Sequence, residues 1–204
     1  MSEIKVTGSP QTYGEGAVRN TKEGKGRFDL IPPEPFQLII DRLTFLRDNH
    51  KSLNVANATI WNLAFSKANY VDAIIALTAR EYVLKGEPHI ATSSLMYPID
   101  TAEEGLWQMM QDLAIHFEKG AKIYGEHNCE KGIPLWSFRD SGLRHTDQYF
   151  KNLEDEPHLI SAIWNFWMLL WTVEQEKKEF EKFKENAYDY AIKDNKLPFD
   201  KMKF

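Results

Sequence analysis

The residues from Pro157 to Lys193 form the longest continuous helical pattern of the chain and limit the fold more than any other segment. Three acidic residues, Glu154 to Glu156, precede Pro157, so carboxylates lie at the positive end of a helix that opens with proline. The first half contains the apolar run AIWNFWMLLW, whereas the part after about Glu174 is highly charged. We therefore predict one long helix that is buried at its start and packed by one face at its end.

The preceding residues repeat apolar side chains at helical spacing. Further helices are expected at about residues 35–49, 55–67, 70–84, 101–124 and 137–153, with connections at 86–101 and 125–134. No segment shows a convincing strand pattern. The predicted fold class is all-α, a helical bundle with an ordered N-terminal arm rich in glycine and lysine.

The arm reads YGEGAVRNTKEGKGRFDLIPP and combines four glycines with four cations. Glycine N–H groups beside cations are able to cradle a phosphate. The P-loop signature GxxxxGK[ST] is absent, however, and no strand precedes the arm. On motif grounds we favour an arm that packs on the domain over a phosphate loop.

Length and composition limit the class of protein. A chain of 204 residues with 43% hydrophobic residues is able to bury a full core in one domain, or in a domain with a large insertion. The net charge of −5 argues against a nucleic-acid binder, and the single cysteine, Cys129, excludes an intrachain disulfide and a cysteine-rich zinc site. Without a signal-like apolar region or a membrane-length apolar run, we expect a cytoplasmic protein with no nucleic-acid and no membrane partner.

A polar stripe runs along the first turns of the long helix. His158, Ser161 and Asn165 follow the three- and four-residue spacing that places side chains on one helix face. Buried polar side chains cost free energy unless they are hydrogen-bonded or bind a ligand. Arg144 and His145, in the preceding helix, are the partners that we expect, so this region is a candidate ligand site.

Four segments, GEGAVRNTKEGKGRFDLIPP, EKGAKIYGEHNCEKGIP, SGLRH and EDEPHLISAIWN, resemble in order and wording the phage-associated dATP/dGTP diphosphohydrolase family. The similarity covers about residues 13–36 and 112–172. It implies a helical enzyme, related in activity to the MazG-like pyrophosphohydrolases, that cleaves a purine deoxynucleoside triphosphate to the monophosphate and pyrophosphate with a divalent metal, Mg²⁺ or Mn²⁺. Such an enzyme adjusts the nucleotide pool during phage infection, and a phage-encoded chain would act in the host cytoplasm.

The chain departs from the family pattern at two positions. Cys129 stands where the family has tryptophan, and Pro157 stands where it has aspartate. Residues 37–111 are longer than the usual link and resemble a helical insertion. We therefore divide the chain into an N-terminal arm (1–36), an insertion (37–111), a motif-bearing core (112–175) and a charged C-terminal helix and tail (176–204).

The implied reaction needs a metal held by oxygen ligands, in some sites with histidine, that converge from neighbouring helices. We assign Asp155, Glu156 and His158 as metal ligands, and His145 and Glu118 as catalytic residues, with His145 polarising water. The ExxE and ExxD pairs of MazG-like enzymes are not cleanly present. The acidic run before the long helix is also explained without a metal, because carboxylates are common at helix N-termini.

Residues at the matched positions also indicate how a nucleotide is held. Arg suits bidentate phosphate binding and Lys acts as a movable point charge, whereas aromatic rings stack on bases and amides read their edges. The expected phosphate-binding cations are Arg27, Lys119, Lys122, Lys131 and Arg144; the expected base contacts are Tyr124 and Trp164 by stacking, and Asn128 and Asn165 by hydrogen bonds.

Two other functions are compatible with these residues. A non-catalytic protein that sequesters a nucleotide would use the same cations and aromatic rings, and the incomplete carboxylate pairing favours it. A structural helical adaptor would leave the polar stripe unexplained. For the diphosphohydrolase we expect a homo-oligomer, because the Trp-rich helix and its charged continuation offer more apolar surface than one thin bundle covers.

Overall fold

The computed structural model describes residues 11–12, 14, 18–19, 23–82 and 96–193. Its helices are α1 (Glu34–Asp48), α2 (Asn57–Trp61) continued by a π-helical turn (Asn62–Ser66), α3 (Tyr70–Tyr82), α4 (Ile99–Tyr124), α5 (Leu135–Phe150) and α6 (His158–Lys193). Two 3-10 turns (Phe28–Leu30 and Asn128–Glu130) and four strands, β1 (Gln11–Thr12), β2 (Val18–Arg19), β3 (Ser52–Asn54) and β4 (Met96–Pro98), complete the described elements. Every described element longer than three residues is helical, which confirms the all-α class.

The short strands correct the expectation that no segment forms one. β1 pairs with β2, and β3 pairs with β4, both antiparallel. Each strand has only two or three residues, too few for the alternation of polar and apolar side chains that reveals a strand in a sequence. β4 lies in the predicted connection at 86–101, most of which falls outside the described residues.

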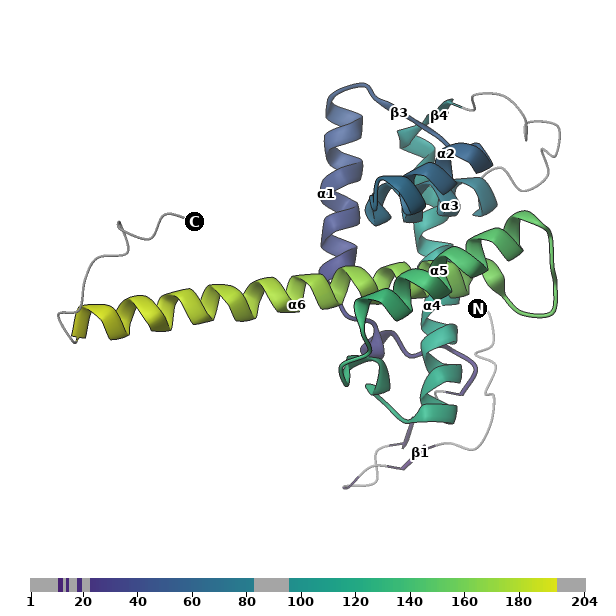
Figure 1. The fold of residues 1–204 in the computed structure, drawn as a ribbon. Coiled ribbons are helices and arrows are strands. Elements are labelled where there is room, and N and C mark those ends of the chain that lie inside the picture. The colour runs from purple at the N-terminus through teal and green to yellow at the C-terminus, as the bar shows by residue number, and fades with distance from the viewer. Residues whose placement is uncertain (1–10, 13, 15–17, 20–22, 83–95, 194–204) are drawn as a thin grey trace.

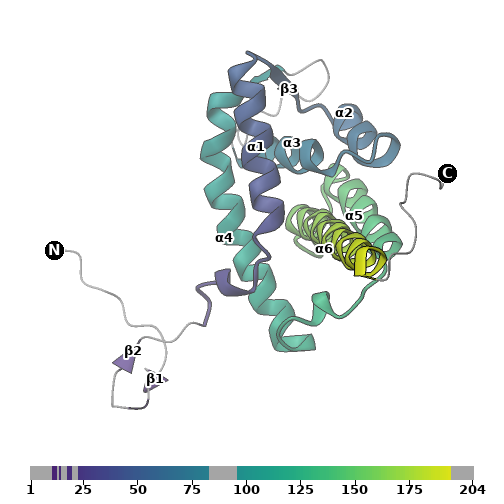
Figure 2. The same ribbon diagram turned by 90° about the vertical axis from the view of Figure 1, so that its left-hand side faces the viewer.

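The helices form two packed pairs. α1 and α4 lie side by side, and α5 packs along α6, to which it is joined by the short segment 151–157 (Figure 2). α3 contacts both pairs, through α4 and through α6. α6 passes through the body, and its second half projects well beyond the other helices (Figure 1). The pairing of α5 with α6 is the contact that builds the candidate site.

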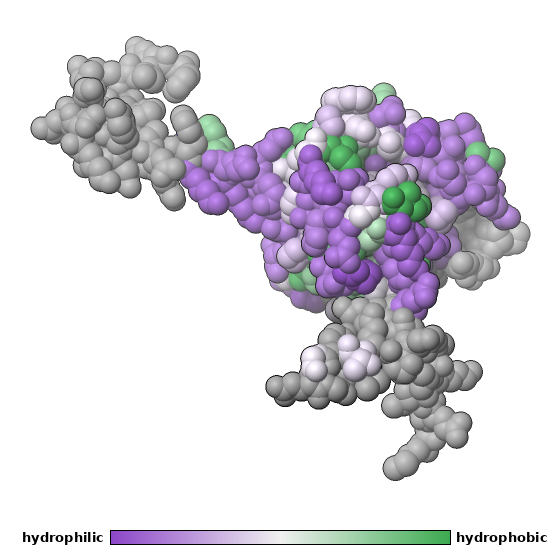
Figure 3. All heavy atoms as spheres, turned by 90° about the horizontal axis from the view of Figure 1, so that it is seen from below, coloured by the Kyte–Doolittle hydropathy of each residue, from purple (hydrophilic) through white to green (hydrophobic). Residues whose placement is uncertain are grey.

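α6 changes character along its length, as the sequence predicts. Ile163, Phe166 and Trp167 have no exposed surface, whereas the side chains of residues 176–182 are exposed. Where the projecting part is coloured in the surface view, it is mostly hydrophilic (Figure 3). Charged side chains thus end the core and leave the helix solvated.

No described helix combines the length and the apolar character that crossing a bilayer requires.

One hydrophobic core includes residues from both sides of position 111, where the sequence analysis separated an insertion from the motif-bearing core. α4 runs continuously across that position, and Ile39 and Leu77 belong to the same buried cluster as Leu113 and Phe166. Residues 37–82 are therefore an integral part of the bundle in structural terms, because their helices bury the same apolar surface as the motif-bearing core.

Residues 23–33 of the arm pack on α4 and α6. The backbone N–H of Arg27 donates to the carbonyl of Ala114 at 2.9 Å, and the Trp167 indole N–H donates to the carbonyl of Pro32 at 3.0 Å. Gly26 has a φ of +81°, and a Cβ added there would lie 2.7 Å from the Cβ of Ala114. Glycine is therefore required at this position for both conformation and close approach.

Candidate functional site

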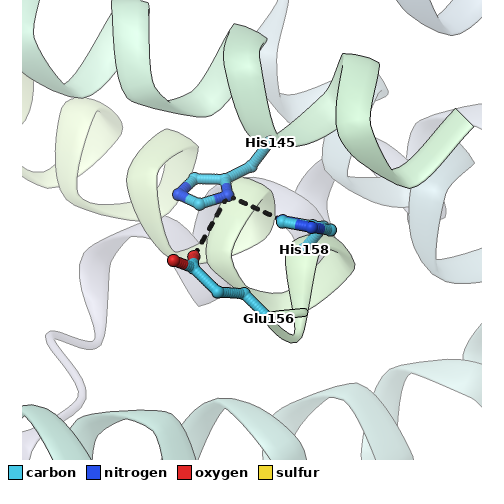
Figure 4. Close-up of side chains that lie close together, drawn as sticks. All are labelled: His145, Glu156 and His158. Carbon is cyan, nitrogen blue, oxygen red and sulfur yellow. Dashed lines mark hydrogen bonds and ion pairs between the residues drawn. The ribbon is translucent and has the colours of Figure 1, made fainter. Parts of the chain in front are cut away.

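Two buried histidines meet where α5 packs against the start of α6. His145 lies in the second half of α5 and His158 is the first residue of α6, and their Nδ1 atoms are 3.1 Å apart (Figure 4). Their exposed fractions are 7% and 3%. The polar stripe predicted on the long helix thus contacts His145, whereas Arg144 is exposed and is placed 3.5 Å from Gln148.

Two carboxylates from the segment before α6 approach the histidine pair. Asp155 Oδ1 lies 2.8 Å from His158 Nε2, and Glu156 Oε2 lies 3.9 Å from His145 Nδ1. Because an ionised carboxylate only accepts hydrogen bonds, the contact with Asp155 requires a proton on Nε2 of His158. The Nδ1 lone pair of His158 then faces His145, the arrangement by which a carboxylate orients a metal-binding imidazole.

The surroundings of His145 favour its neutral imidazole. Burial, followed by the charge of Arg144, lowers the pKa of His145. Burial also lowers the pKa of the neighbouring His116 to about 4, with a further contribution from the charge of Lys119. The hydrogen bond to His158 lowers the pKa of Asp155. Neutral imidazoles and ionised carboxylates are the forms that bind metal ions.

His145, Glu156 and His158 form a compact group of potential ligands. Each offers one ligand atom, and these atoms lie within 4.8 Å of one another. Over the described residues no other histidine, cysteine and carboxylate side chains form such a group. Asp155 lies on the opposite side of the His158 ring, so two of the three predicted ligands, Glu156 and His158, join His145, and Asp155 takes an orienting position.

Glu118 is held by other partners. Its two carboxylate oxygens accept hydrogen bonds from the backbone N–H groups of Gly24, at 2.8 Å, and Gly26, at 2.9 Å, and Lys122 lies 3.1 Å away. The hydrogen bond from Gly24 is the main cause that lowers the pKa of Glu118. The glycine N–H groups of the arm thus bind a carboxylate of the protein itself.

Replacing Glu118 by alanine is expected to release the arm from α4. Because hydrogen bonds to a charged group contribute about 1.5–3 kcal/mol, we expect a loss of that size in the free energy of unfolding. Hydrogen exchange of the Gly24 and Gly26 amides should become faster, while the exposed Glu179→Ala variant should match the wild type. A catalytic Glu118 would instead show lost turnover with unchanged exchange at both glycines.

The predicted phosphate-binding cations fall into two groups. Arg27 forms ion pairs with Asp29 and Glu126, and Lys122 pairs with Glu118 and Glu23. Lys119, Lys131 and Arg144 are exposed, and in the part of the chain that the structure describes they have no ion-pair partner. The second group therefore offers the cations that an incoming phosphate meets without breaking an existing pair.

A cavity of about 360 Å³ opens between α4, the turn that follows it and α6. Three of the predicted base contacts line it: Tyr124, Asn128 and Trp164. Asn165 does not line it, because its amide donates at 2.8 Å to the carbonyl of Ser161 within α6. The remaining walls are mostly apolar, as is usual for small-molecule sites.

His116 is the site residue that sequence reasoning missed. It lines the cavity of about 360 Å³ and also a second cavity of about 190 Å³, which Lys119 and Pro157 border. Pro157 lies between Glu156 and His158 in the chain, so the second cavity adjoins the ligand group. The spacing of His116, Lys119 and Gly120 on one face of α4 was the available signal, but without α6 in place it had no partner.

The comparisons with known proteins agree with the resemblance. Residues 89–182 match the family model described as dATP/dGTP diphosphohydrolase, N-terminal. Neither the curated proteins nor the solved structures contain a match to the chain. The matched stretch contains all of α4 and α5 and the first part of α6, hence both histidines and most of the cavity wall, whereas the GKGRFDLIPP opening precedes it. Residues 89–182 are thus similar to the N-terminal domain of the dATP/dGTP diphosphohydrolase family.

Proposed function

We propose that the chain is a metal-dependent diphosphohydrolase that converts a purine deoxynucleoside triphosphate to the monophosphate and pyrophosphate. The observation that carries the proposal is the group formed by His145 on α5, Glu156 in the segment before α6, and His158 at the start of α6. The family name supports the reaction and the class of substrate. A buried pair of imidazoles beside a carboxylate supports the metal.

The three residues fit a first-row divalent metal ion. Two metal–nitrogen bonds of about 2.05 Å that meet at a tetrahedral angle separate the nitrogens by about 3.3 Å, and the Nδ1 atoms of His145 and His158 are 3.1 Å apart. Two imidazoles with one carboxylate suit Mn²⁺ and the later first-row ions better than Mg²⁺, which prefers oxygen ligands. Of the two predicted ions, Mn²⁺ therefore agrees better with the donors.

A bound metal would neutralise charge on the phosphates and lower the pKa of a water molecule. Asp155 keeps His158 in the tautomer whose Nδ1 is free to bind, and the burial of His145 keeps its ring neutral at pH 7. Lys119, exposed beside the second cavity, supplies positive charge for the phosphate chain. The reaction then adds water across the bond between the α-phosphorus and its bridging oxygen, with pyrophosphate as the leaving group.

The second candidate function is nucleotide binding without turnover. One observation favours it: the ligand group contains a single carboxylate, whereas oxygen-rich sites are usual for ions that bridge phosphates. Such a protein would bind the same nucleotides and release no product.

Product analysis separates the two functions. The full chain would be incubated with each deoxynucleoside and ribonucleoside triphosphate in Mn²⁺, in Mg²⁺ and in chelator, and the products resolved by chromatography. We expect monophosphate and pyrophosphate from purine deoxynucleotides, with Mn²⁺ more effective than Mg²⁺ and no product in chelator. Thermal stabilisation by nucleotides without any product would instead establish the binding protein.

A further inference from the structure

We propose that the cavity of about 360 Å³ beside Trp164 receives the purine base of the nucleotide, and that His116 separates this base from the metal-bound phosphates. The proposal rests on the proposed function and assigns the two ends of its substrate to two cavities. It extends the sequence-based expectation by placing the base in one defined space and by adding His116 as a positioning residue.

The cavity presents a fixed aromatic ring. Trp164 packs against His116, with ring centroids 5.7 Å apart, and edge-on against Phe117 at 6.2 Å and Phe138 at 5.8 Å. These contacts hold the indole in one orientation, so little conformational freedom is lost when a base stacks on it. Stacking on an aromatic ring suits a purine, which offers two fused rings to an apolar wall.

Asn128 supplies a hydrogen-bonding amide in a mostly apolar cavity. It is partly buried, begins the 3-10 turn Asn128–Glu130 and lines the cavity with its neighbour Cys129. A carboxamide both donates and accepts, so it is able to pair with adjacent donor and acceptor atoms of a purine. A 2.7 Å contact between His127 Nδ1 and Glu130 joins the residues on either side of Asn128 and Cys129 and supports the turn.

The arm closes the cavity from another side. Leu30, which is buried, contributes to the wall, and it follows the segment that Glu118 holds through Gly24 and Gly26. The hydrogen bonds of Glu118 thus act indirectly on the shape of the base site.

His116 joins the two cavities and gives the nucleotide a direction. It lines both, and Pro157, which lies between Glu156 and His158 in the chain, borders the second cavity, so His116 lies near the ligand group. A base stacked on Trp164 would extend its sugar past His116 into the second cavity, where Lys119 and Pro157 lie. The phosphates would then reach the segment that carries Glu156 and His158.

Filling the cavity tests the assignment. A Cβ added to Gly120 meets no atom within 4 Å, so Gly120→Leu has room to enter the cavity, and leucine also favours the α4 helix more than glycine does. We expect at least a roughly tenfold higher KM for the purine deoxynucleotide, or a comparable loss of affinity in a titration, with metal affinity unchanged. Lys182→Leu, an equally apolar change at an exposed position of α6, serves as the control and should leave KM unchanged.

A second variant addresses the base edge without filling the cavity. Asn128→Ala should reduce the preference for purine over pyrimidine deoxynucleosides, measured by titration of free deoxyadenosine, deoxyguanosine and thymidine in chelator. The base-site proposal would be overturned if Gly120→Leu kept the wild-type KM and affinity and Asn128→Ala kept the wild-type preference for purines. Hydrolysis observed in the same experiments would still support the proposed function. Conversely, purine binding that Gly120→Leu abolishes, in a chain that releases no product, would support the base site and reject the diphosphohydrolase.

Discussion

Replacing His158 by alanine is expected to remove metal binding and hydrolysis together. His158 supplies one of the two imidazole nitrogens of the ligand group, and it is 3% exposed beside His145. Loss of an orienting partner alone usually lowers metal affinity by 10–100-fold, so loss of the ligand itself should exceed about 100-fold. Metal affinity by isothermal titration and turnover of the purine deoxynucleotide are the two measurements.

Two further variants make this result specific. Asp155→Asn retains the ligand nitrogen but weakens the hydrogen bond that orients it, so we expect an intermediate loss of about 10–100-fold. His50→Asn changes an exposed histidine after α1 and should behave as the wild type. Metal affinity and turnover in His158→Ala within threefold of the wild type would show that the metal, if one is used, binds elsewhere.

Replacing Phe166 by alanine is expected to give the largest loss of stability. Phe166 has no exposed surface, its ring lies 5.2 Å from that of Tyr70, and it fills the space left by Gly142 on α5. Removing a fully buried phenylalanine costs about 3–5 kcal/mol, since apolar contact is lost and a cavity remains. Urea unfolding followed by circular dichroism measures this change.

The exposed Phe180→Ala is the matched control for Phe166. Phe180 is 60% exposed on the projecting part of α6, so its loss should change the free energy of unfolding by less than about 0.5 kcal/mol. Equal effects of the two substitutions would contradict the packing of α5 on α6 that brings His145 to His158.

The positions of the helices could be predicted from the sequence, because apolar spacing and helix start signals are local features. The acidic run and Pro157 predicted the start of α6 to within one residue, and the charged residues after Glu174 predicted where its burial ends. β3 and β4 were missed because their pairing joins Ser52 to Pro98, a contact between distant segments that no local pattern records.

The part of the site whose residues lie close in sequence could be predicted. His145 and His158 are on consecutive helices joined by a short segment, so their contact followed from the polar stripe. The partners of Glu118 were not accessible, since Gly24 lies 94 positions away and meets it only when the arm docks on α4. His116 was missed for the same reason, because both cavities that it lines need elements brought together by folding.

Titration of the full chain with Mn²⁺, followed by the electron paramagnetic resonance signal of the free ion, tests the central claim most directly. The arrangement of His145, Glu156 and His158 predicts one bound ion per chain, tighter than Mg²⁺ in competition, and no bound ion in the combined His145→Ala and His158→Ala variant. Binding of the same stoichiometry and affinity in that variant would contradict the account.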